Sequence, residues 1–308
     1  MDKKEIFGAL NMLIERGQVF QDEPLSKYTK TALGGAADFL VIPATEEEME
    51  KTVLYAYEND IPLLLLGNGS NMIVRDGGVR GIVLHLSALN EIRVDGTRMY
   101  AQAGAHLIDL SRRATEESLT GFEFACGIPG SVGGGMMMNA GAYGGEMKDV
   151  VASVDVLTKE GRRLTLQKEE LALGYRTSII STEGYYVVSA TFVLEKGDKE
   201  EIQAKVDDLT HQRESRQPLE YPSAGSVFKR PPGYFAGKLI QDSGLQGKGC
   251  GGAEVSTKHA GFIINKNDAT ATDYIETIRM VRREVKEKFD VDLELEVRIV
   301  GEEKESNT

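Results

Sequence analysis

Two glycine-rich segments carry the residue types that could hold a phosphate group. Residues 67–71 read Gly-Asn-Gly-Ser-Asn, and residues 127–135 contain five glycines. Without a Cβ the backbone can turn sharply, and its N–H groups can converge on an anion. Asn139 and Tyr143, which follow the second segment, could add directed hydrogen bonds. The two segments predict a cradle for a pyrophosphate, with a capped tight turn and a close-packed glycine crossing as the alternatives.

The common nucleotide-binding motifs and metal sites have no counterpart in the sequence. No G-x-G-x-x-G opens a helix after a strand and no Gly-Lys-Ser/Thr loop occurs, which excludes the Rossmann and P-loop motifs. The cysteines and histidines lack metal-ligand spacing, so we expect no metal and interpret the histidines as structural. These residues are Cys126, Cys250, His85, His106, His211 and His259.

Composition and charge exclude several classes of partner. The 308 residues carry a formal net charge of −12 and contain no basic run, whereas nucleic-acid backbones are bound by clustered Lys and Arg. No apolar run is long enough to span a membrane, and the first residues do not resemble a signal peptide. We therefore expect a cytoplasmic protein that binds neither nucleic acid nor membrane. We also expect a monomer, although composition and charge do not determine the oligomeric state.

Apolar periodicity predicts a mixed α+β fold. A helix is expected at 6–14, and residues 45–48 read as a capping box that opens a helix to about residue 59, ahead of a buried strand at 62–66. We place a domain boundary within a surface helix at 198–214, which precedes a small α+β domain. The other expected strands are 82–84, 99–101, 154–157, 187–193, 262–264 and 293–299, and the other expected helices are 107–117 and 275–285.

The order of the glycine-rich segments resembles the flavin-binding domain of the vanillyl-alcohol-oxidase superfamily. Six segments in sequence narrow this resemblance to the family of UDP-N-acetylenolpyruvoylglucosamine reductases, over nearly residues 20–301. Each segment alone is weakly specific, but their common order is not. The six segments are 28–35, 129–144, 174–178, 224–229, 251–265 and 296–298.

The resemblance implies a fold, a reaction and cofactors. The fold would be a two-part FAD-binding domain of the vanillyl-alcohol-oxidase type, at 1–85 and 86–205, followed by a smaller α+β substrate-binding domain at 206–308. The implied enzyme is an FAD-dependent oxidoreductase that uses NADPH to reduce UDP-N-acetylglucosamine enolpyruvate to UDP-N-acetylmuramate, in peptidoglycan precursor synthesis. FAD would be bound non-covalently, because 67–71 holds no histidine for attachment. Little chain separates Arg176 from Ser226, as in the shorter (type II) branch of the family.

The resemblance places the FAD contacts in the two glycine-rich segments and in the stretch after the second. The implied cofactor-binding residues are Gly67, Asn68, Gly69, Ser70, Asn71, Pro129, Gly130, Ser131, Gly133, Gly134, Asn139, Ala140, Gly141 and Tyr143.

Three residues match the catalytic positions of the family. Hydride delivered to the vinyl carbon of an enolpyruvyl ether leaves carbanion character on the carbon next to the carboxylate. Arg176 is implied to hold that carboxylate through two parallel hydrogen bonds, and one such donor contributes roughly 3–4 kcal/mol in comparable sites. Ser226 is implied to give a proton to the same carbon, and Glu296 to orient the substrate or share a proton. Without the family motifs these three residues would be interpreted as a solvated arginine, a turn hydroxyl and an outward strand carboxylate.

The UDP end of the substrate needs cations, and the resemblance assigns four contacts to it. The implied substrate-binding residues are Tyr175, Arg216, Gln217 and Lys229.

The sequence leaves two alternative functions open. One is a different flavin enzyme of the superfamily that oxidises a small alcohol; the other is a non-catalytic regulator that binds a UDP-sugar or flavin. The sequence departs from the family at Gly135, where alanine is usual, and Cys126 before the loop is interpreted as an inert thiol.

Overall fold

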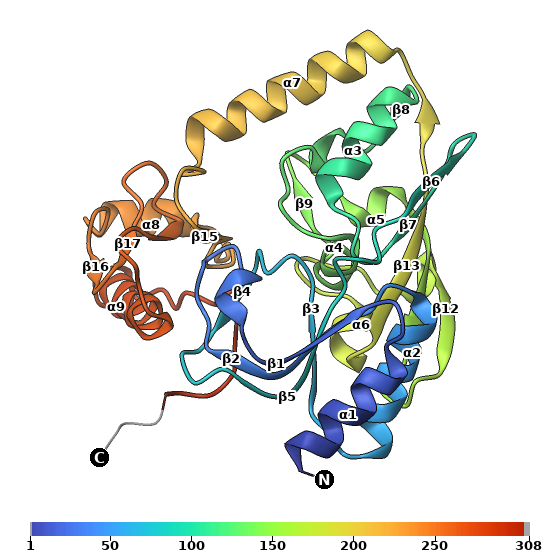
Figure 1. The fold of residues 1–308 in the computed structure, drawn as a ribbon. Helices are drawn as coiled ribbons and strands as arrows, with labels where there is room; N and C mark the ends of the chain where they lie inside the picture. Colours follow the sequence, from blue (N-terminus) through green and yellow to red (C-terminus); the bar gives the residue numbers. More distant parts are fainter. Residues whose placement is uncertain (1, 305–308) are drawn as a thin grey trace. The chain divides into compact units, whose positions relative to one another are not determined.

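The computed structural model describes residues 2–304, which form two compact units. Unit 1 consists of Met1–Gln21, Phe39–Asn68 and Gly81–Arg213. Unit 2 consists of Asp22–Asp38, Gly69–Arg80 and Glu214–Thr308. The chain therefore enters unit 2 three times (Figure 1).

The first part of unit 1 is a helix pair on a four-stranded sheet. The strand order is β1-β2-β5-β3, and its parallel pair runs from Leu63 opposite Ile82 to Leu66 opposite His85. Three of these strands, β1, β2 and β5, cross between the two units. The elements are α1 (Lys3–Leu13), β1 (Gln18–Pro24), β2 (Ala36–Ile42), α2 (Glu46–Glu58), β3 (Leu63–Leu66) and β5 (Val79–His85).

The second part of unit 1 is a five-stranded antiparallel sheet of order β12-β11-β13-β7-β6. Helix α4 packs on β13 and β7. Both parts of unit 1 share one apolar core, in which Phe39, Ile82, Met99 and Phe192 are buried. The elements are β6 (Ile92–Asp95), β7 (Arg98–Gln102), α3 (Leu107–Glu116), β8 (Leu119–Thr120), α4 (Val132–Met138), β9 (Gly141–Ala142), β10 (Gly145–Glu146), α5 (Met147–Val150), β11 (Val151–Leu157), β12 (Arg163–Gln167), α6 (Ile179–Glu183), β13 (Tyr186–Val193), β14 (Glu195–Lys196) and α7 (Lys199–Arg216).

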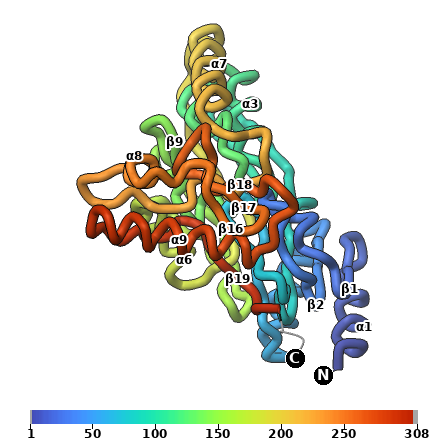
Figure 2. Tube along the Cα trace, turned by 90° about the vertical axis from the view of Figure 1, so that its left-hand side faces the viewer, coloured from blue at the N-terminus to red at the C-terminus, as the bar shows by residue number. Residues whose placement is uncertain are grey.

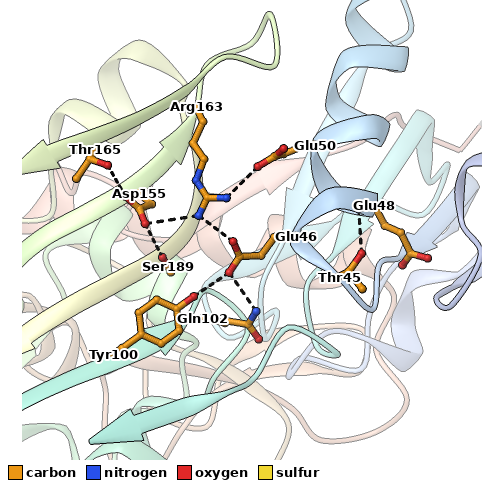
Figure 3. A network of polar contacts seen from close by, with 10 residues as sticks. All are labelled: Thr45, Glu46, Glu48, Glu50, Tyr100, Gln102, Asp155, Arg163, Thr165 and Ser189. Atoms are coloured by element: carbon orange, nitrogen blue, oxygen red, sulfur yellow. Dashed lines mark hydrogen bonds and ion pairs between the residues drawn. The ribbon is translucent and has the colours of Figure 1, made fainter. Parts of the chain in front are cut away.

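A polar network fixes α2 to the five-stranded sheet (Figure 3). The Glu46 carboxylate accepts hydrogen bonds from Tyr100 at 2.8 Å and Gln102 at 3.2 Å. Arg163 reaches Glu46 at 2.8 Å and Glu50 at 3.0 Å with separate nitrogens. Burial disfavours the charge of Glu46, but these hydrogen bonds outweigh it and lower its pKa. Helix α2 and strands β7 and β12 are thereby held together by charge as well as by apolar packing.

Unit 2 is a small antiparallel sheet with a long helix. The strand order is β15-β18-β17-β16, and α9 runs beside β16, β17 and β18 (Figure 2). Tyr274 of α9 is fully buried and donates to the Ile263 carbonyl at 2.6 Å. A separate parallel pair joins β4 to β19. The elements are β4 (Met72–Val74), β15 (Ser223–Ser226), α8 (Ala236–Asp242), β16 (Gly249–Cys250), β17 (Ala253–Val255), β18 (Phe262–Asn265), α9 (Ala271–Phe289) and β19 (Arg298–Val300).

Two local predictions are corrected by the structure. Thr45 caps α2 by accepting from the Glu48 N–H at 3.1 Å, but the capping box is only half made, because the Glu48 carboxylate accepts from the N–H groups of Arg16 and Ala44 instead. The strand expected at 293–299 is reduced to β19, Arg298–Val300. Its first part follows the segment 227–229 through single backbone hydrogen bonds rather than a continuous ladder.

Within residues 2–304, no helix combines the length and apolar character needed to cross a membrane. The same residues contain no group of three or more His, Cys, Asp or Glu side chains arranged to hold a metal ion.

The burial of His85 predicts a loss of stability in acid. Its side chain ends β5, and burial, aided by the nearby His106, lowers its pKa from 6.5 to about 4. Below pH 6.5 this histidine is protonated in the unfolded chain, whereas in the folded chain it stays neutral down to about pH 4. The free energy of unfolding therefore falls as the pH decreases from 6.5 to 4, and below pH 4 this histidine causes no further change. When the pH is lowered from 7 to 5, we expect the unfolding free energy to decrease by about 2 kcal/mol less in His85→Gln than in the parent protein.

Urea unfolding at the two pH values measures this difference, with the exposed His211→Gln as the matched control. Equal pH dependence in the parent and in His85→Gln would show that this histidine does not set the acid limit.

Candidate functional site

The first two residues of the first glycine-rich segment, Gly67 and Asn68, meet the second segment in unit 1. A Cβ on Gly67 would lie 2.6 Å from the Ser131 hydroxyl, so only glycine fits there without a shift. Asn68 donates its side-chain amide to the Pro129 carbonyl at 2.5 Å. The same amide nitrogen lies 3.3 Å from Nδ1 of His106, where the tautomer decides which atom donates. Asn68 and Pro129, 61 positions apart in sequence, are thus in direct contact.

The second segment continues into a helix that the sequence did not predict. Helix α4 includes Gly133, Gly134 and Gly135, residues that disfavour helix by about 1 kcal/mol each relative to alanine. Ser131 caps it by accepting from the Gly134 N–H at 3.4 Å. Tight packing explains two of the glycines: a Cβ on Gly133 would meet Ala103 at 3.2 Å, and one on Gly135 would meet Leu107 at 3.1 Å. Gly134 is exposed, and a Cβ there would find ordinary space.

Asn139 joins the end of α4 to the next part of the site. Its backbone is left-handed, with φ of 45°, and ends the helix. Its side chain is almost fully buried. The amide donates to Glu146 at 2.8 Å and to the Gly174 carbonyl at 3.0 Å, and its oxygen accepts from the Lys148 N–H at 3.0 Å. A ligand contact by Asn139 would therefore involve its backbone rather than the side-chain hydrogen bonds that the sequence suggested.

Arg176 lies in a tight turn that is tied to α4. Gly174 and Thr177 exchange backbone hydrogen bonds across the turn, and Arg176 adopts a left-handed φ of 56°. Its guanidinium carbon lies 5.2 Å from the centre of the Tyr175 ring. Asn139 holds one side of the turn, and Ser178 holds the other by donating to the Met137 carbonyl at 2.7 Å. The strained position of Arg176 is fixed on two sides, as expected for a functional residue.

Ser226 and Glu296 lie on neighbouring segments of unit 2. Ser226 ends β15, opposite Phe262, and is exposed. The Glu296 N–H donates to the Val227 carbonyl at 2.9 Å. Glu296 is thus hydrogen-bonded to the residue that directly follows Ser226. Asn71 donates its side-chain amide to the Glu296 carbonyl at 3.0 Å. A predicted cofactor residue thus positions the backbone of a predicted catalytic residue.

Gly225 lets the chain reach this arrangement. It has φ of 74°, which a residue with a Cβ rarely adopts, although a Cβ there would meet nothing within 4 Å. The requirement is therefore conformational and not one of space. Gly225 lies within β15, where the pairing with β18 shifts register before Ser226.

The remaining predicted ligand residues of unit 2 are less constrained. Lys229 forms a 3.5 Å ion pair with the exposed Glu294, a contact of little energetic weight. Arg216 is exposed at the end of α7. Gln217 has a buried side-chain oxygen that finds no hydrogen-bond donor among residues 2–304, and such an atom costs about 1–3 kcal/mol unless a ligand or water donates to it.

The predicted site residues divide between the units as follows. Unit 1 holds Gly67, Asn68, Pro129, Gly130, Ser131, Gly133, Gly134, Asn139, Ala140, Gly141, Tyr143, Tyr175 and Arg176, whereas unit 2 holds Gly69, Ser70, Asn71, Arg216, Gln217, Ser226, Lys229 and Glu296.

Two residues in unit 1 have roles that sequence reasoning missed. His106 was interpreted as structural, yet it pairs with Ser131 across an isolated bridge and contacts Asn68 between the glycine segments. Arg213 lies near the end of α7, and its side chain lies against Gly127 at the start of the second segment. Proximity in sequence gave no signal for either contact.

Comparison with known proteins identifies both parts of the chain. A family described as FAD binding domain matches residues 37–167. A second family, described as UDP-N-acetylenolpyruvoylglucosamine reductase, C-terminal domain, matches residues 217–300. The two matches follow one another along the chain without overlap.

Similar proteins cover nearly the whole chain. The UDP-N-acetylenolpyruvoylglucosamine reductase of Geobacillus kaustophilus is 62% identical over 300 residues, which are 97% of this chain and 99% of that protein. The enzyme of the same description from Listeria monocytogenes serotype 4b is 58% identical over 283 residues, 92% of this chain and 95% of that protein. The crystal structure of the Thermus caldophilus reductase superposes with a TM-score of 0.79 at 35% identity and covers 92% of this chain and 98% of that one.

A more distant structure shows the fold alone. The glucose dehydrogenase Phl p 4.0202 is 15% identical and superposes with a TM-score of 0.51, covering 63% of this chain and 44% of that one. The architecture is therefore an FAD-binding domain of the vanillyl-alcohol-oxidase type followed by an α+β domain, as the sequence predicted.

The glycine segments fit FAD, and Gly134 offers a test that separates binding from folding. A Cβ at this exposed helical position would meet only the Ser131 hydroxyl, at an ordinary contact distance of 3.6 Å, and leucine favours helix over glycine by roughly 1 kcal/mol. We expect Gly134→Leu to fold at least as stably as the parent without cofactor, but to bind FAD more than about 100-fold more weakly, because the side chain would fill the space of close backbone approach.

Fluorescence titration of FAD measures the affinity, and Gly134→Ala, which adds one methyl group, tests the dependence on size. Parental FAD affinity in Gly134→Leu would remove this glycine from the cofactor site.

Proposed function

Because the chain belongs to the family of UDP-N-acetylenolpyruvoylglucosamine reductases, we propose that it reduces UDP-N-acetylglucosamine enolpyruvate to UDP-N-acetylmuramate with electrons from NADPH. The chain is an FAD-binding oxidoreductase, and its family acts in peptidoglycan synthesis. The observation that carries the proposed substrate is the backbone contact between the Ser226 and Glu296 segments. These segments lie outside the part matched by the general FAD-binding family, and within the part matched by the reductase C-terminal family.

FAD has a place in unit 1 that the residues there can form. The lack of a Cβ at Gly67 lets the first glycine segment approach Ser131, and the bond from Asn68 to Pro129 holds the segments together. These residues would hold FAD, which would supply the hydride-transfer chemistry between NADPH and the vinyl carbon of the substrate. We propose that 1–85 and 86–205 act as its two binding subdomains and that 206–308 binds the sugar nucleotide.

Arg176 provides the positive charge that the reaction needs. Hydride addition to the vinyl carbon leaves negative charge on the neighbouring carbon and on its carboxylate. A guanidinium that donates two parallel hydrogen bonds to that carboxylate stabilises this charge more than it stabilises the starting ether. The left-handed turn, held by Asn139 and Ser178, keeps Arg176 in one orientation before substrate arrives.

Ser226 completes the reaction by donating its hydroxyl proton to the carbon next to the carboxylate. A serine hydroxyl is a weak acid, but the carbon that receives the proton is strongly basic at this stage. Lys229, three residues along the chain, supplies positive charge that would favour the resulting alkoxide. Glu296, held beside this segment by its bond to Val227, orients the substrate or returns the proton.

We assign the diphosphate of the substrate to Arg216 at the end of α7 and to Lys229, three residues after Ser226, with Tyr175 as a further contact. Arg216 is exposed, and Gln217 has a buried oxygen that needs a donor. Between Arg176 and Ser226 the chain is taken up by α6, β13, β14 and α7, which supports placement in the shorter branch, without an added lid. We further propose that the enzyme acts as a cytoplasmic monomer.

Separate measurement of the two half-reactions tests the role of Ser226. We expect Ser226→Ala to reduce its FAD with NADPH at close to the parental rate, because that step requires no proton from the serine. Reoxidation by the enolpyruvyl sugar should slow by about 10²–10⁴-fold. Stopped-flow absorbance of the flavin measures both steps without oxygen.

Ser223→Ala, on the same strand, is the matched control and should leave both steps unchanged. Equal slowing of the two half-reactions in Ser226→Ala would assign the serine to the flavin site and not to proton transfer.

Salt tests the cationic contacts to the diphosphate. Without a covering lid, attraction between exposed cations and phosphate is screened as ionic strength rises, since the Debye length falls from about 10 Å at 0.1 M to about 3 Å at 1 M. We expect the KM for the sugar nucleotide to rise several-fold over this range, and Arg216→Ala to raise it at low salt and weaken its salt dependence.

Arg282→Ala, an exposed arginine on α9, serves as the control for net charge. A KM that changes neither with salt nor in Arg216→Ala would show that other residues bind the diphosphate.

A further inference from the structure

Arg213 occupies an unusual position at the start of the second glycine segment. It lies near the end of α7, and its side chain crosses Gly127, two residues before Pro129. A Cβ on Gly127 would lie 2.3 Å from Cδ and 3.1 Å from Nε of this arginine. Glycine at 127 is therefore what allows the guanidinium to approach the segment.

The charge of Arg213 has no counter-ion in the part of the chain that the structure describes. No hydrogen bond or ion pair of its side chain occurs among residues 2–304, although the residue is half-buried. Arg163, which is more exposed, contacts three carboxylates at 2.8–3.5 Å. The groups that act electrostatically on Arg213 are Tyr143 and Cys126, neither of which is a carboxylate. Burial accordingly lowers the pKa of Arg213.

Such a cation is costly unless something pairs with it. A partly desolvated charge without a partner destabilises a folded chain, and buried charges are normally paired. The helix dipole does not explain the position, because the exposed Arg216 in the same last turn would interact with it as well. The nitrogens of Arg213 are not among the fully enclosed polar atoms that lack a partner, so the guanidinium keeps an accessible face.

The residues near the Arg213 guanidinium indicate which anion it binds. Gly127 leads directly into Pro129 and Ser131, which contact the first glycine segment through Asn68 and Gly67. Tyr143, which acts electrostatically on Arg213, follows the end of α4. Of the residues around Arg213, Tyr143 is itself an implied cofactor contact, and Gly127 lies two residues before the implied contact Pro129. The formal anion of FAD is its diphosphate.

We propose that Arg213 is a cofactor-binding residue whose guanidinium pairs with the diphosphate of FAD. Its planar fork can donate two parallel hydrogen bonds to phosphate oxygens, which a lysine cannot. The inference rests on FAD binding by this family, and not on the substrate or on the roles given to Arg176 and Ser226. It makes α7 part of the flavin site through one side chain.

Cofactor titration of flavin-free protein tests the proposal without NADPH or sugar nucleotide. We expect Arg213→Gln to raise the Kd for FAD about 10- to 100-fold, the range for charge-assisted hydrogen bonds. Affinity for riboflavin, which lacks the phosphates, should not change. Rising salt should weaken FAD binding less in the variant than in the parent. Arg213→Lys, which keeps the charge without the fork, should fall between the two.

Two controls separate this role from a structural one. Arg112→Gln, an exposed arginine of α3, controls for net charge and should bind FAD as the parent does. Thermal unfolding of the flavin-free proteins should give Arg213→Gln a stability equal to or above that of the parent, because it removes an unpaired charge. Should Arg213→Gln not fold, the titration is decided by Arg213→Lys.

Three results would overturn the proposal. Parental FAD affinity in Arg213→Gln and Arg213→Lys would mean that the guanidinium does not touch the cofactor. Riboflavin affinity that falls as much as FAD affinity, with a changed reduction potential, would place the arginine at the flavin ring. Unchanged FAD affinity with a higher KM for NADPH or sugar nucleotide would assign its anion to a substrate.

Discussion

The contact between Gly67 and Ser131 is the constraint on which the cofactor site depends. Two segments 60 residues apart can form one cradle only if their backbones approach closely, and a Cβ at Gly67 would lie 2.6 Å from the Ser131 hydroxyl. The bond from Asn68 to Pro129 then fixes their register. The same serine caps α4, so the close approach and the start of the helix are specified together.

Helix α4 carries this constraint to the reacting groups of unit 1. Asn139 ends the helix and donates to the Gly174 carbonyl, while the Met137 carbonyl accepts from Ser178. The turn that bears Arg176 is therefore attached at both ends to a helix that the flavin segment begins. A change in the glycine segment should reach the orientation of Arg176 without any direct contact between them. In unit 2, Asn71 and Val227 hold the backbone of Glu296 in a comparable way.

Much of the fold was predictable because the apolar residues of each segment recur with the spacing of either a helix or a strand. The helix at 46–58, the strands at 63–66, 151–157 and 186–193 and the helix at 271–289 all lie where periodicity or a cap placed them. Helix α4 was missed because three glycines contradict helix propensity, and tertiary packing against Ala103 and Leu107 overrides that preference. The strand expected at 293–299 was wrong over most of its length, because alternation predicts extended chain but not a pairing partner.

The site residues that lie within family motifs could be predicted from the sequence. Contacts between side chains that are distant in sequence could not be predicted, because no local sequence pattern indicates them. Arg213 is the example: its place near the end of a polar helix suggests a solvated charge, and only the position of Gly127 reveals its burial. Asn139 shows the converse, since its amide suggested a ligand contact and the structure uses it to join Glu146, Lys148 and Gly174.

A single turnover with isotope labels tests the central claim most directly. FAD-loaded protein is reduced with NADPH that carries deuterium at both positions of nicotinamide C4, and is then mixed with UDP-N-acetylglucosamine enolpyruvate in ordinary water without oxygen. Mass spectrometry and NMR of the product should find UDP-N-acetylmuramate with hydrogen from water on the carbon next to the carboxylate and with deuterium only in its methyl group, to the extent that deuterium on the reduced flavin nitrogen has not exchanged with water before the substrate is added. Recovery of unchanged enolpyruvyl sugar from flavin that stays reduced, or deuterium on the carbon next to the carboxylate, would contradict the account.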